Sequence, residues 1–327
     1  MKALVYTGTN ESEIRDVEAP VAGVGQSIVD VTFCGICGSD MHAWHGHDER
    51  RIPPLVLGHE AVGTVRSGPL EGARVAINPL MSCGACQACI SGNRHLCAGR
   101  ELIGMRYPGA FAEQVMIPDS NLTRLDDSLS FRNAALAEPL AVAVRTVGLG
   151  EQGGATPDSR SVILGGGAIG LLCAQVMKAG GYAPPRIAET NGLRRAMLEE
   201  LGLGETYEPR NGGPEDGSVD LVIDAVGMGT TRAAASAMVR PGGVIVHVGL
   251  QDNGPGLDTR RITLQEIAFL GVYCYRDDDF ARAIDLLTSG EVSGEGWAEI
   301  RQLDDGAEAF IDIDQGRAPP KIILSNS

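Results

Sequence analysis

The amino-acid sequence predicts an α/β protein of two domains, one of which contains a doubly wound parallel sheet. The chain has 327 residues, and roughly 150 residues per domain is a usual size. Between residues 161 and 273, short apolar runs alternate with helix-like segments. Strands that alternate with helices are typical of a parallel sheet covered on both faces. A glycine-rich turn begins this alternation and favours the same fold.

The first part of the chain begins with a candidate β-strand. Residues 1–8, MKALVYTG, carry one lysine and a short alternating apolar run, and a second apolar run, IVDVTFC, occupies residues 28–34. The start lacks the apolar core and the small-residue cleavage site of a signal peptide. No run approaches the roughly 20 apolar residues of a membrane helix. We therefore expect a cytoplasmic protein, in which clustered thiols bind metal more often than they form disulfides.

The charge balance limits the classes of partner. The chain has 27 Lys and Arg against 42 Asp and Glu, for a formal net charge of −15. An acidic surface repels phosphate backbones and anionic lipids, so we expect neither nucleic acid nor a membrane as partner. A zinc-ribbon nucleic-acid binder is the weakest of the alternatives for this reason.

Four of the eight cysteines lie in one short loop, CGACQACISGNRHLC. Their C-x2-C-x2-C-x7-C spacing lets a turn direct successive sulfurs at one point, and four thiolates without an open position are typical of structural zinc. An iron–sulfur cluster is the alternative, because the first three cysteines have ferredoxin spacing. The fourth lacks the short gap and following proline of that pattern, which favours zinc. The residues are Cys83, Cys86, Cys89 and Cys97.

A second group of metal-competent side chains lies upstream, in CGICGSDMHAWHGH and LGHEAVG. It contains Cys37, His59 and Glu60, with Asp40 and His42 nearby. A mixed thiolate, imidazole and carboxylate set with a spare position suits a catalytic zinc, because substrate must reach the metal. Spacing alone leaves ordinary structural roles for these residues open as the alternative.

Residues 161–170, SVILGGGAIG, predict a strand that enters a dinucleotide-binding turn and a following helix. The next strand, PRIAE, ends in Glu189, where an acidic side chain can bind the ribose hydroxyls of NAD and repel the 2′-phosphate of NADP. Arg194 and Arg195 complicate this choice, because an arginine there can bind phosphate. The predicted cofactor contacts are Gly165, Gly167, Ala168, Ile169, Gly170, Glu189, Arg194, Val248 and Leu250.

The alternation continues beyond this turn. Apolar runs at 219–227, 242–250 and 266–273 predict three further strands, and residues 230–239 predict a helix between the first two. Residues 277–290, DDDFARAIDLLTSG, combine an acidic first turn, spaced apolar residues and a final glycine. They predict an amphipathic helix after the last strand.

The sequence resembles the medium-chain, zinc-dependent alcohol and polyol dehydrogenases along nearly its whole length, and the sorbitol and threonine dehydrogenases most. The resemblance rests on motifs in the family's order, which are CGICGSD, GHEAVG, the four-cysteine loop, GAFAEQVMIP, ALAEPLAVAVR and GGGAIG. One departure is the segment YCY at 273–275, where polyol dehydrogenases often carry Phe-Arg-Tyr. The missing arginine puts sorbitol itself in doubt as substrate.

The resemblance implies a role for each candidate site residue. Cys37 and His59 would hold a catalytic zinc, with Glu138 as third ligand or bound through a water and Glu60 able to exchange in. The four-cysteine loop would hold a structural zinc, so the family carries two zinc ions per chain.

Three more residues receive roles from the same resemblance. Asp40 would orient His59, while Ser39 and His42 would relay the proton of the alcohol towards solvent.

The family also implies the organisation of the chain. A GroES-like, β-rich catalytic domain would comprise residues 1–139 and 272–327, and a Rossmann domain would comprise residues 140–271. The expected activity is reversible oxidation of a secondary alcohol on a polyol or sugar derivative, with NAD in preference to NADP, in a homodimer or homotetramer. The alternatives are an NADPH-dependent zinc-containing aldehyde or ketone reductase and a non-catalytic cofactor-binding protein of the same fold.

Overall fold

The computed structural model describes residues 1–326, which divide into two compact units. Unit 1 comprises residues 1–138 and 276–327, and unit 2 comprises residues 139–275. The sequence predicted divisions after residues 139 and 271, whereas the two units divide after residues 138 and 275, so that Pro139 and residues 272–275 group with unit 2. Within residues 1–326, no helix has both the length and the apolar character needed to cross a membrane.

Unit 1 is rich in short β-strands. Its elements, in chain order, are β1 (Lys2–Gly8), β2 (Glu11–Asp16), β3 (Gln26–Gly35), α1 (Gly38–Trp44), β4 (Leu55–Val56), β5 (Glu60–Ser67), β6 (Arg74–Ile77), β7 (Leu80–Met81), α2 (Gln87–Ile90), η1 (Arg94–Leu96), β8 (Glu101–Leu102), β9 (Gln114–Pro118), η2 (Asp119–Asn121), β10 (Leu122–Arg124), α3 (Phe131–Ala134), α9 (Asp277–Thr288), β17 (Ala298–Gln302), η4 (Leu303–Asp305), α10 (Gly306–Asp314) and β18 (Lys321–Ser325).

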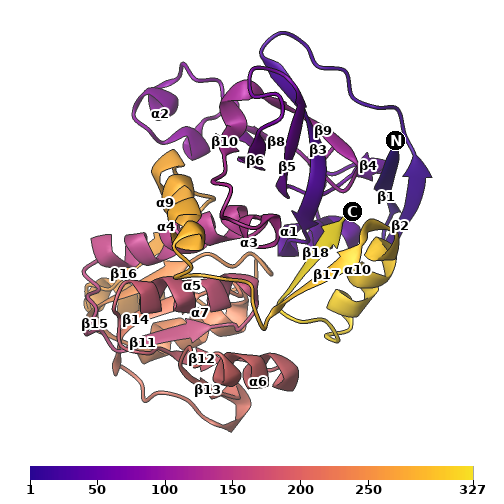
Figure 1. Cartoon of the computed structure of the whole chain (residues 1–327). Helices are drawn as coiled ribbons and strands as arrows, with labels where there is room; N and C mark the ends of the chain where they lie inside the picture. Colours follow the sequence, from indigo (N-terminus) through magenta and orange to yellow (C-terminus); the bar gives the residue numbers. More distant parts are fainter. Residues whose placement is uncertain (327) are drawn as a thin grey trace. The chain divides into compact units, whose positions relative to one another are not determined.

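The largest sheet of unit 1 joins the two ends of the chain. Its seven strands run in the order β10-β6-β5-β3-β18-β17, with β9 also paired to β3. Strand β18 pairs antiparallel with β3, so that Ile323 lies opposite Gly35. Figure 1 shows the C-terminal strands, in yellow, beside the indigo N-terminal ones. This pairing brings the last strand of the chain next to the strand that leads into CGICGSD.

A buried cluster under these strands forms the core of unit 1. Phe111 and Phe310 meet edge to face at 6.1 Å between ring centroids, and Trp44 lies 6.0 Å from Phe310. Aromatic pairs of this geometry add about 0.5 to 1.5 kcal/mol beyond the area that they bury. The cluster therefore packs α1 and α10 around the core of the unit.

Unit 2 is the doubly wound sheet that the alternating pattern predicted. Its elements are β11 (Ser161–Leu164), α5 (Ala168–Ala179), β12 (Arg186–Ala188), α6 (Gly192–Glu200), β13 (Glu205–Tyr207), η3 (Pro209–Asn211), β14 (Val219–Asp224), α7 (Gly229–Met238), β15 (Val239–His247), α8 (Thr259–Leu264) and β16 (Ala268–Gly271). A helix that begins in unit 1, α4 (Ala137–Gln152), continues into unit 2.

The six strands of unit 2 are all parallel and lie in the order β13-β12-β11-β14-β15-β16. This is the Rossmann order, in which the strand order reverses between β11 and β14. Buried β-branched residues such as Val162, Val222 and Ile245 form its core. Ligands of such sheets bind beyond the carboxyl ends of the strands at this reversal.

The predicted strands and helices of unit 2 are present, and the helix predicted over 277–290 is α9 of unit 1. Three acidic residues occupy the first turn of α9, and the Arg276 N–H donates to Asp279 Oδ2 at 2.8 Å, which caps the helix. The sequence patterns did not predict β13, α6 or α8. β13 has only three residues, too few for a period-2 pattern to stand out.

Candidate active site

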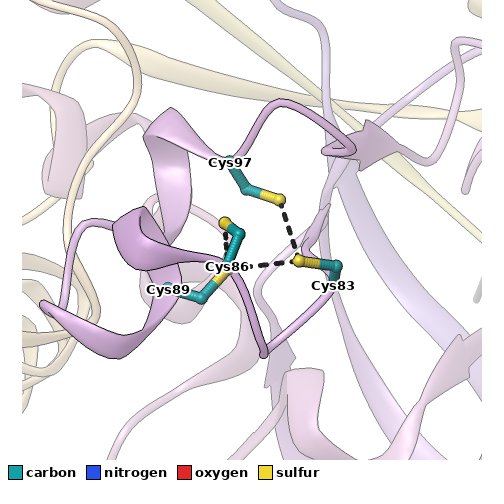
Figure 2. Close-up of side chains that lie close together, drawn as sticks. All are labelled: Cys83, Cys86, Cys89 and Cys97. Atoms are coloured by element: carbon teal, nitrogen blue, oxygen red, sulfur yellow. Dashed lines mark hydrogen bonds between the residues drawn. The ribbon is translucent and has the colours of Figure 1, made fainter.

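The four cysteines of the short loop converge on one point (Figure 2). The sulfurs of Cys83 and Cys97 are 3.5 Å apart, those of Cys86 and Cys89 are 3.5 Å apart, and those of Cys83 and Cys89 are 3.9 Å apart. All four are free thiols, and a disulfide would hold two sulfurs at about 2.05 Å. Disulfides are therefore excluded in this loop.

The spacing of the sulfurs fits one zinc ion. A Zn–S bond is about 2.3 Å, so a regular tetrahedron has sulfur–sulfur edges of about 3.8 Å. The distances of 3.5 to 3.9 Å bracket that value. A cluster of several iron and sulfide ions needs a wider cage than sulfurs in mutual contact can enclose. The loop has the geometry of a structural zinc site with no open position.

The local backbone conformation places the cysteine sulfurs of this loop for metal binding. Cys86 is the N-cap residue of α2, and Cys89 lies three residues further on, so both sulfurs lie on the same side of one helical turn. Gly84 has a φ of +70°, which side-chain-bearing residues rarely adopt, and provides the turn between Cys83 and Cys86. Backbone N–H groups of Ala85 and Cys86 lower the pKa of the exposed Cys83 thiol to about 6. They favour the thiolate that a metal requires.

A second cluster is built from residues around α1 and β5. Cys37 is the N-cap residue of α1, His59 precedes β5, and Glu60 begins β5. Their ligand atoms all lie within 4.8 Å of one another. His59 and Glu60 are buried and Cys37 is half-buried. A thiolate, an imidazole and a carboxylate supply three ligands and leave a fourth position, as a catalytic zinc requires.

Asp40 orients two members of this cluster. It is fully buried, its Oδ2 accepts the Cys37 N–H at 3.0 Å, and its Oδ1 lies 3.4 Å from Nδ1 of His59. That nitrogen has no hydrogen-bond partner among the described residues. Burial opposes ionisation of Asp40, but the charge and contact of His59, together with the charge of Arg51 and the Cys37 N–H, outweigh it and lower the pKa of the carboxyl. A carboxylate on the Nδ1 side of a histidine leaves Nε2 available to a metal.

A buried lysine, which sequence patterns did not identify, faces the same cluster. Lys321 Nζ donates to Glu60 Oε1 at 2.9 Å, to Glu60 Oε2 at 2.6 Å and to the Ile36 carbonyl at 2.9 Å. Burial disfavours its charge, but Glu60 and Cys37 together outweigh burial and raise the pKa of Lys321 above its ordinary value. The two residues are 261 positions apart, and the KIIL sequence around Lys321 indicates only a strand. No local signal could have linked them.

The two carboxylates implied as zinc ligands, Glu60 and Glu138, occupy different positions. Glu60 lies within the cluster, whereas Glu138, in the first turn of α4, is not among the described residues that share it. Burial lowers the pKa of Lys321, and Glu60 and Cys37 do most to raise it. The charge of Glu138, which is buried, adds a smaller effect in the same upward direction. Both carboxylates of the expected exchange thus influence the same lysine.

The two expected relay residues lie on α1. Ser39 and His42 are three positions apart, so they share one face of the helix, and both are half-buried. Burial, together with the neighbouring His47 and His45, lowers the pKa of His42. A neutral imidazole at physiological pH can accept a proton.

The glycine-rich turn of unit 2 has the predicted strand–turn–helix geometry. Gly165 follows β11 with a φ of +98°, and Gly167 is the N-cap residue of α5. A Cβ on Gly170 would lie 1.9 Å from the Gly165 carbonyl oxygen, so no other residue fits there. Ala168 and Ile169 open α5. The turn presents the N-terminus of a twelve-residue helix, as a pyrophosphate site requires.

Glu189 lies beside this turn, one residue beyond β12, and is buried. Its Oε2 accepts the Gly166 N–H at 2.8 Å, and its Oε1 accepts the Asn191 N–H at 2.7 Å. These bonds hold the carboxylate at the carboxyl end of the strand. Oε1 also accepts a hydrogen bond from the Thr190 hydroxyl at 3.5 Å. Oε2 keeps a further lone pair, which a ribose hydroxyl can use.

The remaining predicted cofactor contacts lie at the same edge of the sheet. Val248 and Leu250 follow β15, and Leu250 is 74% exposed. Arg194 lies on α6, and one of its terminal nitrogens would be 3.9 Å from a Cβ on Gly167. Its Nε has no hydrogen-bond partner within residues 1–326. An arginine beside the glycine turn is a candidate phosphate contact.

Unit 1 also contains a cavity of about 670 Å³, which neither the cluster of Cys37, His59 and Glu60 nor the glycine-rich turn lines. This cavity is bounded by largely apolar side chains from β1, β4 and β9 and the segments next to them. Of the predicted site residues, Cys83 alone lines it.

Comparison with known families agrees with this geometry. Residues 23–127 match the alcohol dehydrogenase GroES-like domain family, and residues 168–289 match the zinc-binding dehydrogenase family. The first region includes both metal-competent clusters, and the second includes most of the Rossmann sheet.

Individual relatives cover almost the whole chain. The 2-dehydro-3-deoxy-L-galactonate 5-dehydrogenase of Pseudoalteromonas atlantica is 30% identical over 96% of this chain and 95% of its own. An alcohol dehydrogenase from Escherichia coli CFT073, solved with NADH, is 25% identical, covers 99% of both chains and has a TM-score of 0.89. A zinc-binding dehydrogenase from Sinorhizobium meliloti 1021, solved with NADP, is 29% identical, with a TM-score of 0.86 and coverage of 99% and 98%.

The two family matches, the four-cysteine zinc site, the Cys/His/Glu cluster and the dinucleotide-binding turn lead to one assignment. The chain belongs to the zinc-containing medium-chain alcohol dehydrogenase family, whose members are NAD(P)-dependent oxidoreductases acting on CH–OH groups.

Proposed function

We propose that the protein catalyses the reversible, zinc-dependent oxidation of a secondary alcohol on a polyol or sugar derivative, with NAD as hydride acceptor. The observation that carries the proposal is the convergence of Cys37, His59 and Glu60 with a position left for substrate. A non-catalytic cofactor-binding protein would have no use for such a cluster beside Ser39 and His42, so the arrangement favours an enzyme.

Cys37, His59 and a carboxylate, either Glu60 or Glu138, would hold the zinc, whose Lewis acidity makes a nearby hydroxyl more acidic. Ser39 accepts the proton of the substrate hydroxyl, and His42 passes it towards solvent. Asp40 keeps the His59 ring in one orientation during these steps. NAD would supply the acceptor for the hydride that leaves the carbon bearing this hydroxyl.

The buried carboxylate of Glu189 supports NAD as the preferred cofactor. It would accept hydrogen bonds from the ribose hydroxyls and would repel a 2′-phosphate. The structural relatives divide on this point, since one was solved with NADH and another with NADP. The local contacts of Glu189 therefore carry more weight than the comparison.

The substrate class rests on the sequence relatives and the family resemblance. The relative from P. atlantica is, by its name, a dehydrogenase that acts at carbon 5 of a sugar acid. A chain that shares 30% identity with it along nearly its full length is a candidate for similar hydroxylated substrates.

The test is NADH formation by zinc-replete protein with xylitol, sorbitol, L-galactonate and 2,3-butanediol, each with NAD and with NADP. We expect turnover of at least one polyol or sugar acid with NAD, abolished by a chelator and restored by zinc. Silence across the panel, from protein that still binds NADH, would overturn the proposed activity.

A second candidate is an NADPH-dependent reductase, and the position of Arg194 beside Gly167 favours it. The comparison of Glu189→Gln with Arg194→Ala separates the two. For an NAD enzyme, Glu189→Gln should lower kcat/KM for NAD relative to NADP by about 10-fold or more, since one charged hydrogen bond contributes about 1.5 to 3 kcal/mol. The exposed Glu200→Gln is the control. A larger loss with NADPH in Arg194→Ala would favour the reductase.

We also propose that the protein forms a homodimer or homotetramer. Strand β16 is an edge strand of the parallel sheet, and its unpaired backbone groups can be covered by a second copy. Sedimentation equilibrium would test this, and a monomer at micromolar concentration would contradict it.

A further inference from the structure

A buried arginine in unit 1 makes contact with one of the expected relay residues. Arg51 lies in the loop between α1 and β4, and its side chain is only 1% exposed. Arginine is rarely this deeply buried unless its charge is paired. Its partner is Asp48, whose Oδ2 lies 2.8 Å from Arg51 Nη1.

The guanidinium of Arg51 also binds three oxygens that belong to two other segments. Nε donates to the Gly104 carbonyl at 2.8 Å, and Nη1 donates to the Ser39 carbonyl at 3.1 Å. Nη2 points at the Ser39 hydroxyl with a separation of 3.4 Å. The rigid fork of one side chain therefore spans the first turn of α1, the loop after it and the loop that follows β8.

Two of these contacts involve the same residue, so they restrain Ser39 at both its backbone and its side chain. An arginine only donates hydrogen bonds, because it does not lose its proton in proteins. The contact to the hydroxyl therefore takes one lone pair of Oγ, and the proton of Ser39 must point elsewhere. One lone pair remains, which can accept the proton of a substrate hydroxyl.

We propose that Arg51, held by Asp48, is a positioning residue that orients the Ser39 hydroxyl as a one-way proton carrier. The inference rests on the proposed function, because it needs Ser39 to receive the proton of the alcohol. A positive group beside Oγ also stabilises the transient negative charge on Ser39 when its own proton passes to His42 and the proton of the alcohol replaces it. The 3.4 Å separation leaves room for this contact to shorten when substrate is present.

A neighbouring arginine provides a matched control. Arg50 also pairs with Asp48, with Nε 2.8 Å from Oδ1, but its side chain is 56% exposed. Arg50→Gln therefore perturbs the same carboxylate without removing the contact to Ser39.

The experiment is a double-mutant cycle between Arg51→Lys and Ser39→Ala, measured with NAD and whichever of xylitol or L-galactonate the wild type oxidises faster. A lysine can keep the ion pair with Asp48 but cannot reach all three oxygens. We expect Arg51→Lys to lower kcat about 10-fold and Ser39→Ala to lower it about 100-fold, in the range of general acid–base effects. The kcat of the double variant should match that of Ser39→Ala within about twofold, because Arg51 acts through Ser39.

Two readouts separate positioning from loss of structure. Arg51→Lys should raise the solvent deuterium isotope effect on kcat, while zinc content and NADH affinity from fluorescence titration stay within about twofold of wild type. Arg50→Gln should change none of these. If Arg51→Lys does not fold, Asp48→Asn replaces it in the same cycle, with the same non-additivity expected.

The outcomes distinguish this inference from the proposed function. The positioning role would be overturned if Arg51→Lys lowered kcat by the same factor in the Ser39→Ala variant as in the wild type. An unchanged kcat in Arg51→Lys would also overturn it. Unchanged turnover in Ser39→Ala itself would instead remove the proton relay from the proposed function. Absence of turnover with either substrate would count against the proposed function before Arg51 is tested.

Discussion

The two metal-competent clusters of unit 1 are assembled in opposite ways. All four cysteines of the loop lie between residues 83 and 97, and Cys83 is exposed to solvent. The cluster of Cys37, His59 and Glu60 is largely buried, and the lysine that neutralises Glu60 comes from the last strand. The first cluster depends on a short stretch of chain, and the second depends on the register of a seven-stranded sheet.

This difference in construction predicts a difference in behaviour. The four-cysteine loop should gain its order from metal binding, because a bound ion is what holds four thiolates together. A cluster fixed by β3, β5 and β18 keeps its shape through strand pairing, with or without the ion. Loss of metal should therefore disorder the loop. In the buried cluster it should abolish catalysis but leave the arrangement of the side chains unchanged.

The largest effect is expected from Cys37→Ser. Turnover should fall by about four orders of magnitude, because Lewis-acid stabilisation is worth several kcal/mol and each 1.36 kcal/mol is a factor of ten. The melting temperature and NADH affinity should change little, since strand pairing maintains the cluster. Steady-state kinetics, calorimetry and fluorescence titration measure these three quantities.

Cys34→Ala is the matched control for that variant. Cys34 is a buried cysteine three positions earlier, and it is not part of either metal-competent group. Its replacement should leave turnover within about threefold of wild type. Comparable losses in both variants would mean that the thiols act through packing and not as ligands.

The second largest effect is expected on stability, from Lys321→Met. Removing the lysine leaves Glu60 buried without its counter-charge, which should cost about 3 to 5 kcal/mol in the free energy of unfolding. Urea titration of the zinc-free protein measures this directly. The double variant Lys321→Met/Glu60→Leu should recover most of the loss, because an apolar pair can replace a buried ion pair at little cost. A double variant no more stable than Lys321→Met would contradict this account.

A local effect is expected from Cys83→Ser. The loop should lose its ion, and backbone amides of residues 83–97 should exchange with solvent much faster, while the buried cluster keeps its metal. Turnover should stay within about tenfold of wild type. Metal analysis and hydrogen exchange by mass spectrometry provide the measurements. Loss of the second ion in the same variant would show that the two clusters are not independent.

The smallest effect is expected from Lys2→Met. This variant tests whether the separation of an ion pair along the sequence, without burial, determines its contribution to the free energy of unfolding. Lys2 pairs with Asp304 across 302 positions, but the two side chains are 44% and 57% exposed. Exposed ion pairs contribute less than about 1 kcal/mol to the free energy of unfolding. A loss as large as that of Lys321→Met would refute burial as the cause of the difference.

Local patterns were sufficient to predict much of this protein. The spacing of the loop cysteines predicted one metal site, because all its ligands follow from a short turn. Gly165, Gly170 and Glu189 were identifiable because the dinucleotide-binding turn requires each at a set place beside a strand. The roles of Ser39, Asp40 and His42 came from resemblance to a family, since no spacing by itself distinguishes a relay from surface residues.

The Rossmann sheet, the glycine turn and the four-cysteine site can be predicted from the amino-acid sequence, because each is encoded in a short run of residues. Three further features depend on the folded chain. Glu60 groups with Cys37 and His59 among the described residues, Lys321 neutralises Glu60, and Arg51 contacts Ser39. These contacts join segments that no local sequence pattern links. They arise because antiparallel pairing sets β18 beside β3 and because long polar side chains, once buried, must find partners.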